Sequence, residues 1–345
     1  MTLITFNILQ LISSCLHLAT TTTVPYKTML GGYRIPALGY GTFTVRNETE
    51  LTIALNEALR VGYRHIDTAQ LYENEHIIGK VLTDWFTSGR LQREDLFVTT
   101  KIHLTNAFPH KVEKAVNKSL TDLRLDYIDL LLIHCPISFE KDGKGGLLLA
   151  VATDHIGTWK KMEEQVDAGL VRSLGLSNFN ISQIERIRAS ARIQPANLQI
   201  EIHPYFQEKE LRDYCKKHNI VVVAYSSLGA PGVLTFFRDV GWKETPLPSI
   251  LTDSEIVRIS KKHNKTPAQV ALRFIIQLDL VAIPKSTNAK RIKENMEIFD
   301  FELDDQDMED IEKLEKGIGT KIIHMQFLAP NVAEHPEYPF TELLT

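Results

Sequence analysis

From residue 37 onward, short β-branched runs alternate with longer amphipathic stretches, and eight such pairs follow one another without a Pro-, Gly- or Ser-rich linker. Eight strand-helix units in about 260 residues are what a single (β/α)8 barrel requires. A doubly wound sheet normally has fewer strands and divides into halves. No repeat at a fixed period is visible, which excludes a solenoid. We therefore predict an α/β fold, a single (β/α)8 TIM barrel with an N-terminal hairpin and long loops.

Each predicted strand is a short apolar run bounded by polar or turn-forming residues. The predicted strands are Ala37–Gly41, Arg64–Asp67, Phe97–Lys101, Tyr127–His134, Ser173–Leu176, Asn197–Glu201, Val221–Tyr225 and Val281–Pro284. Two helices have clear apolar faces, made of Leu51, Ala54, Leu55, Ala58 and Leu59 in the first and of Val112, Ala115, Val116, Leu120 and Leu123 in the second. Gly62 follows the first helix as a C-cap.

Three segments are too long for simple turns: 136–155, 229–252 and the tail beyond Lys316. Long loops on a barrel usually shape the substrate pocket. With 345 residues and 43% hydrophobic content, the chain can bury a large core. We assign residues 24–345 to one barrel domain.

Charge and cysteine content exclude several classes of partner. A net charge of -4 without a block of like charges indicates no nucleic acid and no membrane as partners. The three cysteines show neither CxxC spacing nor a zinc pattern, so no metal site is predicted. We expect a monomer that binds a small molecule.

Residues 1–23 resemble a targeting segment. No charged side chain precedes Lys27, and an apolar stretch from Leu3 to about Leu18 is followed by small residues. The stretch is too short for a membrane span but is typical of a secretory signal peptide, although the usual basic start is missing. The alternative is a disordered extension. The protein is secreted if the segment is a signal, and otherwise cytoplasmic. Four Asn-x-Ser/Thr sequons, at Asn47, Asn117, Asn180 and Asn264, permit glycosylation after export.

Ionisable residues close several predicted strands: Asp67, Lys101 and His134. The carboxyl ends of barrel strands form one rim, so these side chains can converge there, with Tyr72 just beyond Asp67. Each also has a structural interpretation, as a helix cap, a solvated lysine or a core histidine. Three ionisable residues on one barrel rim favour a shared catalytic role over three separate structural roles.

Together these four residues suit the protonation of an oxygen. A nearby lysine ammonium favours the phenolate and lowers the pKa of a tyrosine, here Tyr72. Asp67 can keep Lys101 charged, and His134 can orient a carbonyl oxygen and share the proton load. This arrangement fits hydride transfer to a carbonyl rather than hydrolysis.

A phosphate-binding segment follows the last predicted strand, in "VAIPKSTNAKRIKENMEIF". Lys285, Ser286, Thr287 and Asn288 offer donors at a helix start, and Arg291, Glu294 and Asn295 follow within two turns. Two cations that bracket hydroxyl groups suit a phosphate monoester such as the 2′-phosphate of NADP. The alternative is a well-capped helix with solvated charges. No G-x-G-x-x-G motif follows the first strand.

Over residues 28–340 the chain resembles the aldo-keto reductases. The motifs that carry the resemblance are "LGYGTF", "DTAQLYENE", "TTKI", "LLIHCP", "GLSNF", "LQIEIHPY", "AYSSLG", "IPKSTNAKRIKEN" and "EHPEYPF". The resemblance implies a (β/α)8 barrel that reduces aldehydes and ketones with NADPH. It places the catalytic tetrad on Asp67, Tyr72, Lys101 and His134, with Tyr72 as general acid. It places cofactor contacts on Gly41, Thr42, Ser177, Asn178, Gln199, Tyr225, Ser226, Leu228, Lys285, Ser286, Thr287, Asn288, Arg291, Glu294 and Asn295.

In the family, the residues matched by Ser177, Asn178 and Gln199 hold the nicotinamide carboxamide, and the residue matched by Tyr225 stacks on its ring. The resemblance further implies that Lys285 and Arg291 clasp the 2′-phosphate. These are the roles that we expect for NADPH and NADP+ here.

Three pocket positions depart from the family pattern. Many members carry tryptophan where this chain has Phe43, His103 and Cys135, so we expect a wider pocket and a bulkier carbonyl substrate. Insect members that reduce 3-dehydroecdysone are similar, and they suggest a steroid ketone; a general aldehyde or aldose-type reductase is the alternative. Gly232 stands where relatives often carry an aspartate, which predicts a looser clasp and fast NADPH release.

Two rival interpretations remain. Lys101 could form a Schiff base in an aldolase-type barrel, although the phosphate-binding segment argues against this. The same scaffold could also serve as a non-enzymatic binding protein, and the loss of a tetrad member would favour that reading. All four tetrad residues are present.

Overall fold

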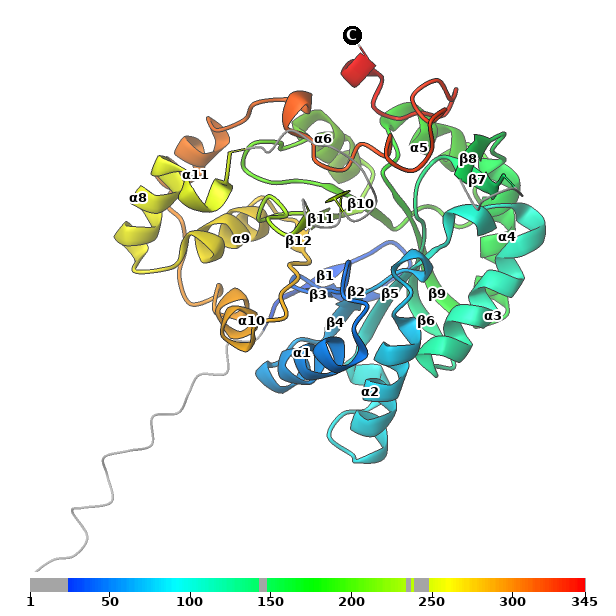
Figure 1. Ribbon diagram of the computed structural model, residues 1–345, viewed down its shortest axis with the longest axis horizontal. Helices are drawn as coiled ribbons and strands as arrows, with labels where there is room; N and C mark the ends of the chain where they lie inside the picture. The colour runs from blue at the N-terminus through cyan, green and yellow to red at the C-terminus, as the bar shows by residue number, and fades with distance from the viewer. Residues whose placement is uncertain (1–23, 143–147, 234–236, 239–247, 345) are drawn as a thin grey trace, which may run out of the picture.

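The computed structural model describes residues 24–142, 148–233, 237–238 and 248–344. Eight parallel strands form one curved sheet in chain order, and helices surround it (Figure 1). The strands are β3 (Tyr40–Gly41), β4 (His65–Asp67), β5 (Phe97–Ile102), β6 (Ile128–Ile133), β9 (Val171–Ser177), β10 (Asn197–Glu201), β11 (Val221–Tyr225) and β12 (Val281–Ala282). All eight predicted strands are confirmed, with ends shifted by up to three residues.

The sheet closes through the segment before β3. Leu38 forms a parallel bridge with Ala282, and the amide of Gly39 donates to the Ala282 carbonyl at 2.8 Å. A Cβ added to Gly41 would lie 2.6 Å from the carbonyl oxygen of Ile283, so glycine is required for this close approach. The predicted (β/α)8 barrel is therefore confirmed.

The helices bury the faces that their sequences predict. They are α1 (Glu48–Val61), α2 (Glu75–Thr87), α3 (Val112–Leu123), α4 (His155–Asp167), α5 (Ile181–Arg188), α6 (Lys209–Lys217), α8 (Ser254–His263), α9 (Pro267–Gln277), α10 (Ala289–Met296) and α11 (Asp305–Glu312). All five predicted apolar residues of α1 are buried, as are all five of α3. Gly62 caps α1 with φ of 109°.

Two hairpins flank the barrel. The predicted N-terminal hairpin is present as β1 (Tyr26–Thr28) and β2 (Arg34–Pro36), which pair antiparallel. The segment after β6, predicted as a long loop, instead contains a second hairpin, β7 (Ser138–Lys141) and β8 (Leu148–Val151). Phe139 and Ala150 alternate inward, and they bury against the C-terminal tail. This hairpin was not predicted from the sequence, because the alternation of apolar residues extends over only a short segment.

The C-terminal tail packs against the second hairpin. Apart from the short 3₁₀ helices Ile318–Thr320 and Thr341–Leu344, it is irregular, yet it packs with the hairpin in one apolar cluster. The tail members of this cluster are Met325, Ala329, Val332, Tyr338 and Phe340.

No helix among the described residues is long and apolar enough to cross a membrane. The proposed signal segment 1–23 and most of the loop after Val233 lie outside those residues.

Candidate active site

The four predicted catalytic residues meet at the carboxyl ends of three neighbouring strands. Asp67 ends β4, Lys101 lies near the end of β5, and His134 directly follows β6. Tyr72 ends the short 3₁₀ helix Gln70–Tyr72, which links β4 to α2. Adjacent parallel strands bring their ends to one rim, so the sequence-based prediction that these residues converge is confirmed.

Lys101 is the centre of the group, with only 1% of its surface exposed. Its Nζ donates to Asp67 Oδ1 at 2.6 Å and to the carbonyl oxygen of Thr68 at 2.9 Å. It lies 3.3 Å from the Tyr72 hydroxyl oxygen. A buried ammonium without partners would be very costly, and these three oxygens satisfy it. Burial disfavours its charged form, but Asp67 and Tyr72 outweigh this and raise the pKa of Lys101.

The pKa of Tyr72 departs from the prediction. Burial is the largest effect and raises the pKa above 10, whereas Lys101 acts in the predicted lowering direction. The expectation that the pKa of Tyr72 is lowered is therefore wrong for the protein without ligands. The loss of hydration on burial raises the pKa more than the Lys101 ammonium lowers it. Tyr72 is consequently protonated at neutral pH, which is the state required of an acid.

His134 lies beside Tyr72, with ring centroids 5.7 Å apart in an edge-to-face arrangement. Burial, Lys101 and His103 together hold the pKa of His134 well below its usual range. The ring is therefore neutral near pH 7, and it suits hydrogen bonding rather than the predicted sharing of the proton load. Its Nδ1 is buried and has no partner among the described residues.

The predicted nicotinamide contacts adjoin this group. Gln199 Nε2 donates to Asp67 Oδ2 at 2.7 Å, so Asp67 is held from two sides. Tyr225 donates its hydroxyl to Asn178 Oδ1 at 2.6 Å, and Asn178 Nδ2 lies 3.0 Å from both the His134 carbonyl and Ser177 Oγ. Asn178 has φ of 65°, a conformation that asparagine tolerates. The structure brings these residues together at the rim.

Four further predicted contacts border the same rim. Thr42 is fully buried and donates to the Asp67 carbonyl at 3.0 Å, and Gly41 precedes it at the barrel closure. Ser226 follows β11 with φ of 55°, and Leu228 packs against the main core. A left-handed serine is uncommon and marks local strain at this strand end.

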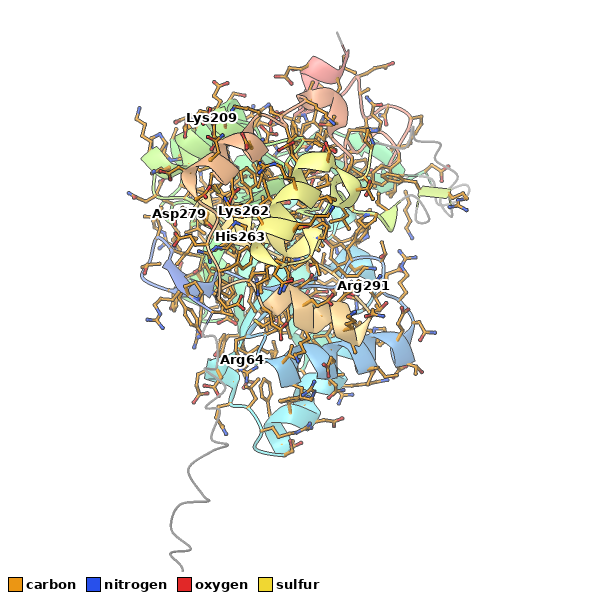
Figure 2. The ribbon with its side chains drawn as sticks, turned by 90° about the vertical axis from the view of Figure 1, so that its left-hand side faces the viewer. Arg64, Lys209, Lys262, His263, Asp279 and Arg291 are labelled. Carbon is orange, nitrogen blue, oxygen red and sulfur yellow. The ribbon has the colours of Figure 1, made fainter. Side chains whose placement is uncertain are left out.

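The predicted phosphate segment forms a capped helix start. Asn288 caps α10 by accepting from the Arg291 amide at 3.1 Å. Arg291 Nε lies 3.4 Å from Ser286 Oγ. Ser286 is neutral, so it does not compensate the positive charge of Arg291. Arg291 is exposed, and Figure 2 labels it beside α10. Burial and Arg291 lower the pKa of Lys285, while Glu50 raises it.

The remaining members of that segment differ in exposure. Thr287 is half-buried beside the cap, and Asn295 is buried. Glu294 lies 3.6 Å from Lys290 of the same helix. Lys285 and Arg291 form no direct ion pair with a described carboxylate, although Glu50 acts on Lys285 from a greater distance. Two cations therefore gather here without a contacting counterion.

The three pocket positions have different surroundings. Phe43 lies against Tyr72, with centroids 5.0 Å apart. The His103 amide donates to Gln70 Oε1 at 2.9 Å, and its ring Nδ1 accepts from the Thr105 amide at 3.1 Å. Cys135 is buried in the cluster formed with the C-terminal tail, and burial raises the pKa of its thiol to about 12. Cys135 is therefore an apolar wall residue and not a reactive thiol.

Sequence reasoning missed Glu201, a fully buried carboxylate that ends β10. It accepts from His203 Nε2 at 3.1 Å and from the amides of Ile322 and Ile323 at 2.7 and 2.8 Å. Lys321 Nζ lies 3.9 Å away. The rule used for Asp67, an acid that closes an apolar strand, also applies to "LQIE". Apart from His203, however, the partners of Glu201 lie in the tail, more than a hundred residues away. Glu201 therefore anchors the C-terminal tail to the barrel.

Gly232 is exposed, and a Cβ placed there meets nothing within 4 Å. The residues that follow Val233 lie largely outside the described part of the chain, so the looser clasp stays a prediction. Within the described residues, no group of three or more His, Cys, Asp or Glu is arranged to hold a metal ion.

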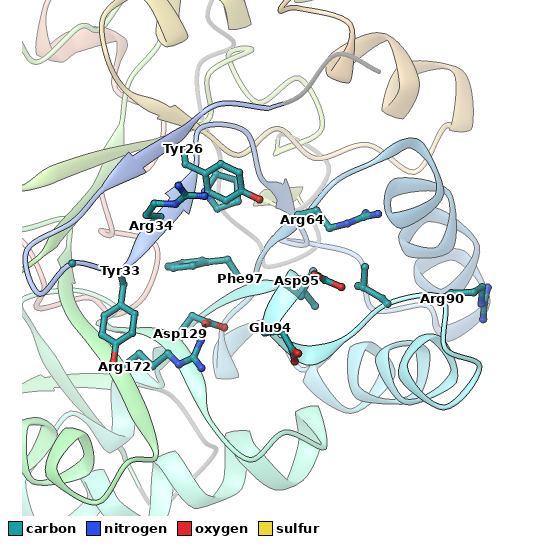
Figure 3. Close-up of a pocket in the computed structure, with 14 residues that line it drawn as sticks. Tyr26, Tyr33, Arg34, Arg64, Arg90, Glu94, Asp95, Phe97, Asp129 and Arg172 are labelled. Carbon is teal, nitrogen blue, oxygen red and sulfur yellow. Dashed lines mark hydrogen bonds and ion pairs between the residues drawn. The ribbon is translucent and has the colours of Figure 1, made fainter. Parts of the chain in front are cut away.

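A cavity of about 750 Å³ lies at the opposite end of the barrel, under the β1–β2 hairpin. Figure 3 shows its polar lining, in which Arg172 pairs with Asp129 at 3.2 Å and Arg34 stacks on Tyr26. Arg172 and Asp129 neutralise one another, and the hollow faces the amino ends of the strands. Catalytic groups of such barrels lie at the carboxyl ends, so chemistry and not volume locates the active site.

Comparison with known proteins identifies the family of the chain. A model of the aldo/keto reductase family matches residues 37–316. Prostaglandin F synthase 1 of Bos taurus is 40% identical over 90% of this chain and 96% of its own. Aldo-keto reductase family 1 member C15 of Rattus norvegicus is 41% identical over 90% of this chain and 95% of its own. The aldose reductase structure from Schistosoma japonicum is 38% identical, has a TM-score of 0.80, and aligns over 92% of this chain and 99% of its own. The chain therefore belongs to the aldo/keto reductase family, whose members are oxidoreductases that act on carbonyl compounds.

Proposed function

We propose that this protein reduces aldehydes or ketones to alcohols with NADPH, and that Tyr72 is the general acid. The observation that carries the proposal is the position of Lys101, whose ammonium contacts both Asp67 and the Tyr72 hydroxyl on the catalytic rim. A hydrolase would need an activated nucleophile or water, whereas this group is built to deliver one proton and to stabilise the anion left behind.

The residues at the rim fit NADPH, which would supply the hydride when bound. Lys285 and Arg291 offer two cations that form no direct ion pair with a described carboxylate, and a 2′-phosphate would complement them. Ser177, Asn178 and Gln199 present amide and hydroxyl groups beside the tetrad, which suits a carboxamide. Gly41, Thr42, Tyr225, Ser226 and Leu228 would border the same cofactor.

The protein's own residues would manage the proton. As hydride adds to the carbonyl carbon, the carbonyl π pair moves to oxygen, and the Tyr72 O–H bond breaks to protonate that oxygen. The products are the alcohol and a phenolate, which regains a proton before the next turnover. Lys101 stabilises the phenolate at 3.3 Å, and Asp67 keeps Lys101 charged. Neutral His134 would orient the carbonyl oxygen by a hydrogen bond.

For the substrate we favour a bulky ketone such as a 3-dehydroecdysteroid over a small aldehyde. Phe43, His103 and Cys135 are all smaller than the tryptophans of many family members. Cys135 also lies within an apolar cluster built from the second hairpin and the tail, which would give a ketone with a large ring system an apolar wall. A general aldehyde or aldose-type reductase is the alternative.

Isotope transfer tests the proposal. NADPH with deuterium at its transferable position would be incubated with p-nitrobenzaldehyde, a sugar aldehyde and 3-dehydroecdysone, and products analysed by mass spectrometry. We expect alcohols with one deuterium on the carbinol carbon, with the highest kcat/KM for the steroid ketone. Preference for the sugar aldehyde would favour the aldose-type alternative. Absence of deuterated alcohol with every carbonyl would overturn the proposed reaction, and a borohydride-trapped adduct on Lys101 would indicate an aldolase-type enzyme instead.

A further inference from the structure

Two chain segments carry the acid and its lysine, and side chains outside the tetrad tie these segments together. The first runs from Gln70 to Glu75 and contains Tyr72; the second runs from Thr100 to His103 and contains Lys101. We infer that Gln70 and Glu75 are positioning residues that set the separation between the Tyr72 hydroxyl and Lys101 Nζ. We call these two side chains the Gln70–Glu75 clamp. The inference rests on the proposed role of Tyr72.

Gln70 uses both ends of its amide. Its Oε1 accepts from the His103 amide at 2.9 Å, two residues beyond Lys101. Its Nε2 donates to the Ala115 carbonyl at 2.6 Å and to Ser119 Oγ at 2.9 Å, both on α3. Gln70 lies in the same helical turn as Tyr72, so its four partners, with Asn106 Nδ2 at 3.4 Å the weakest, fix that turn against β5 and α3.

Glu75 makes the second bridge from the other side of Tyr72. Its Oε1 accepts from Thr100 Oγ1 at 2.6 Å, and Thr100 directly precedes Lys101. Its Oε2 accepts from Ser119 Oγ at 3.1 Å, so both bridges share Ser119. Tyr72 and Lys101 are thereby bracketed: each lies between two residues that belong to the same hydrogen-bonded ring.

Burying the carboxyl group of Glu75 costs desolvation free energy. Only 3% of the residue is exposed, and no described cation forms an ion pair with it. An apolar side chain of similar volume would avoid this desolvation cost, so packing alone does not account for a carboxyl here. The bond to Thr100 accounts for it, because it fixes the strand position next to Lys101.

Burial raises the pKa of Glu75 to about 7, while bonds from Thr100 and Ser119 act in the opposite direction. The other charged groups that face it come from α3: Asp122 raises the pKa and Lys118 lowers it. When ionised, Glu75 accepts from both hydroxyls. When it is protonated, one carboxyl oxygen becomes a donor, and the hydroxyl that faces it must turn to accept. Bonds to the neutral acid are weaker than bonds to the carboxylate, so the clamp is strongest above the pKa of Glu75.

The inference predicts a specific kinetic pattern for Gln70→Met, which keeps the length of the side chain and removes its hydrogen bonds. With NADPH and p-nitrobenzaldehyde, kcat should fall about 10- to 100-fold, since a misplacement of about 1 Å costs about 100-fold. The Kd for NADPH should change less than about twofold, because the clamp does not reach the cofactor residues. The matched control is Gln207→Met, at a buried glutamine that also makes three side-chain bonds, to Pro204, Ile311 and Glu312 outside the site. This change should leave kcat unchanged.

The pH profile separates positioning from simple stability. For the wild type, kcat should decrease as pH falls through about 7, whereas Glu75→Gln, which cannot ionise, should have a low kcat without that step. An identical step in both proteins would overturn the role of Glu75. If Gln70→Met does not fold, Ser119→Ala removes only the hydroxyl shared by both bridges and should lower kcat similarly. A wild-type kcat in folded Gln70→Met or in Ser119→Ala, with Tyr72→Phe inactive, would refute the clamp but leave the proposed function intact; activity in Tyr72→Phe would refute both.

Discussion

At the scale of single residues, Lys101 and Asp67 form a buried pair whose members depend on each other. Lys101→Met would leave the Asp67 carboxylate with Gln199 as its main partner, at 2.7 Å. Removing one member of a buried pair typically costs ~3 kcal/mol or more. We therefore expect a loss of about 3 kcal/mol in the free energy of unfolding, measured with urea, and at least a 100-fold loss of kcat.

The double variant Lys101→Met/Asp67→Asn is the matched control for this pair. The double variant also removes the unpaired Asp67 carboxylate. The free energy of unfolding should therefore largely return to the wild-type value, while activity stays lost. Equal destabilisation of the single and double variants would show that packing, and not the ion pair, determines the stability of this site.

Buried histidines give the stability of the fold a definite pH dependence. Burial, then Lys101, lower the pKa of His65 to about 3, and the pKa of His134 is also well below 6.5. In the unfolded chain both groups bind a proton near pH 6.5, which the folded protein does not. The unfolded state therefore binds more protons below that pH, and the folded state loses stability as the pH falls.

The expected slope is up to about 1.4 kcal/mol per pH unit for His65 between about pH 6 and 4, and His134 contributes in the same direction. Urea unfolding across this range measures it. His65→Gln, which can still bond to Thr99, should reduce the slope by about one group. A slope that His65→Gln leaves unchanged would contradict the neutral, buried state of this ring.

At the scale of elements, we propose that the start of α10 selects between the two nicotinamide cofactors. Arg291 has no carboxylate partner among the described residues and is the cation that we assign to the 2′-phosphate. Arg291→Met should raise the Kd for NADPH about 10- to 100-fold while changing the Kd for NADH little, as a charge-assisted contact to phosphate is worth about 1.5–3 kcal/mol. Titration of the intrinsic fluorescence with each cofactor measures both constants.

Lys290→Met is the control on the same helix, because Lys290 is exposed and lies near Glu294 at 3.6 Å. It should leave both constants unchanged. A parallel loss of NADPH and NADH affinity in Arg291→Met would contradict the assignment of this helix to the 2′-phosphate.

The elements also show where sequence reasoning succeeds. Alternating apolar runs and amphipathic helices determine the barrel, and polar residues at strand ends locate Asp67, Lys101 and His134, since both patterns are local. Hydrogen bonds between distant segments are not local. Two features depend on packing between distant elements: the anchoring of the tail by Glu201, and the ring formed by Gln70, Ser119 and Glu75. The spacing of residues in the sequence does not predict such packing. The pKa of Tyr72 was mispredicted for a related reason, because burial outweighs the single charge, Lys101, that convergence at the barrel rim suggested.

At the scale of the whole molecule, the barrel described from residue 24 onward accounts for the site without residues 1–23. The secretory signal that we assign to those residues predicts that the natural mature protein begins beyond about residue 20. N-terminal sequencing of protein from its native source measures this directly. A mature protein that begins at Met1 or Thr2 would contradict export by this route and favour the cytoplasm.

The whole molecule presents one chemical focus on the barrel rim, where Lys101, paired with Asp67, contacts the Tyr72 hydroxyl group. Tyr72→Phe removes only that hydroxyl and keeps the ring that packs between Phe43 and His134. The decisive measurement is the rate of NADPH-dependent carbonyl reduction by Tyr72→Phe beside its Kd for NADPH. We predict that reduction falls to background, a loss of at least 100-fold, while NADPH binds as in the wild type. Substantial carbonyl reduction by Tyr72→Phe would contradict the assignment of Tyr72 as the acid.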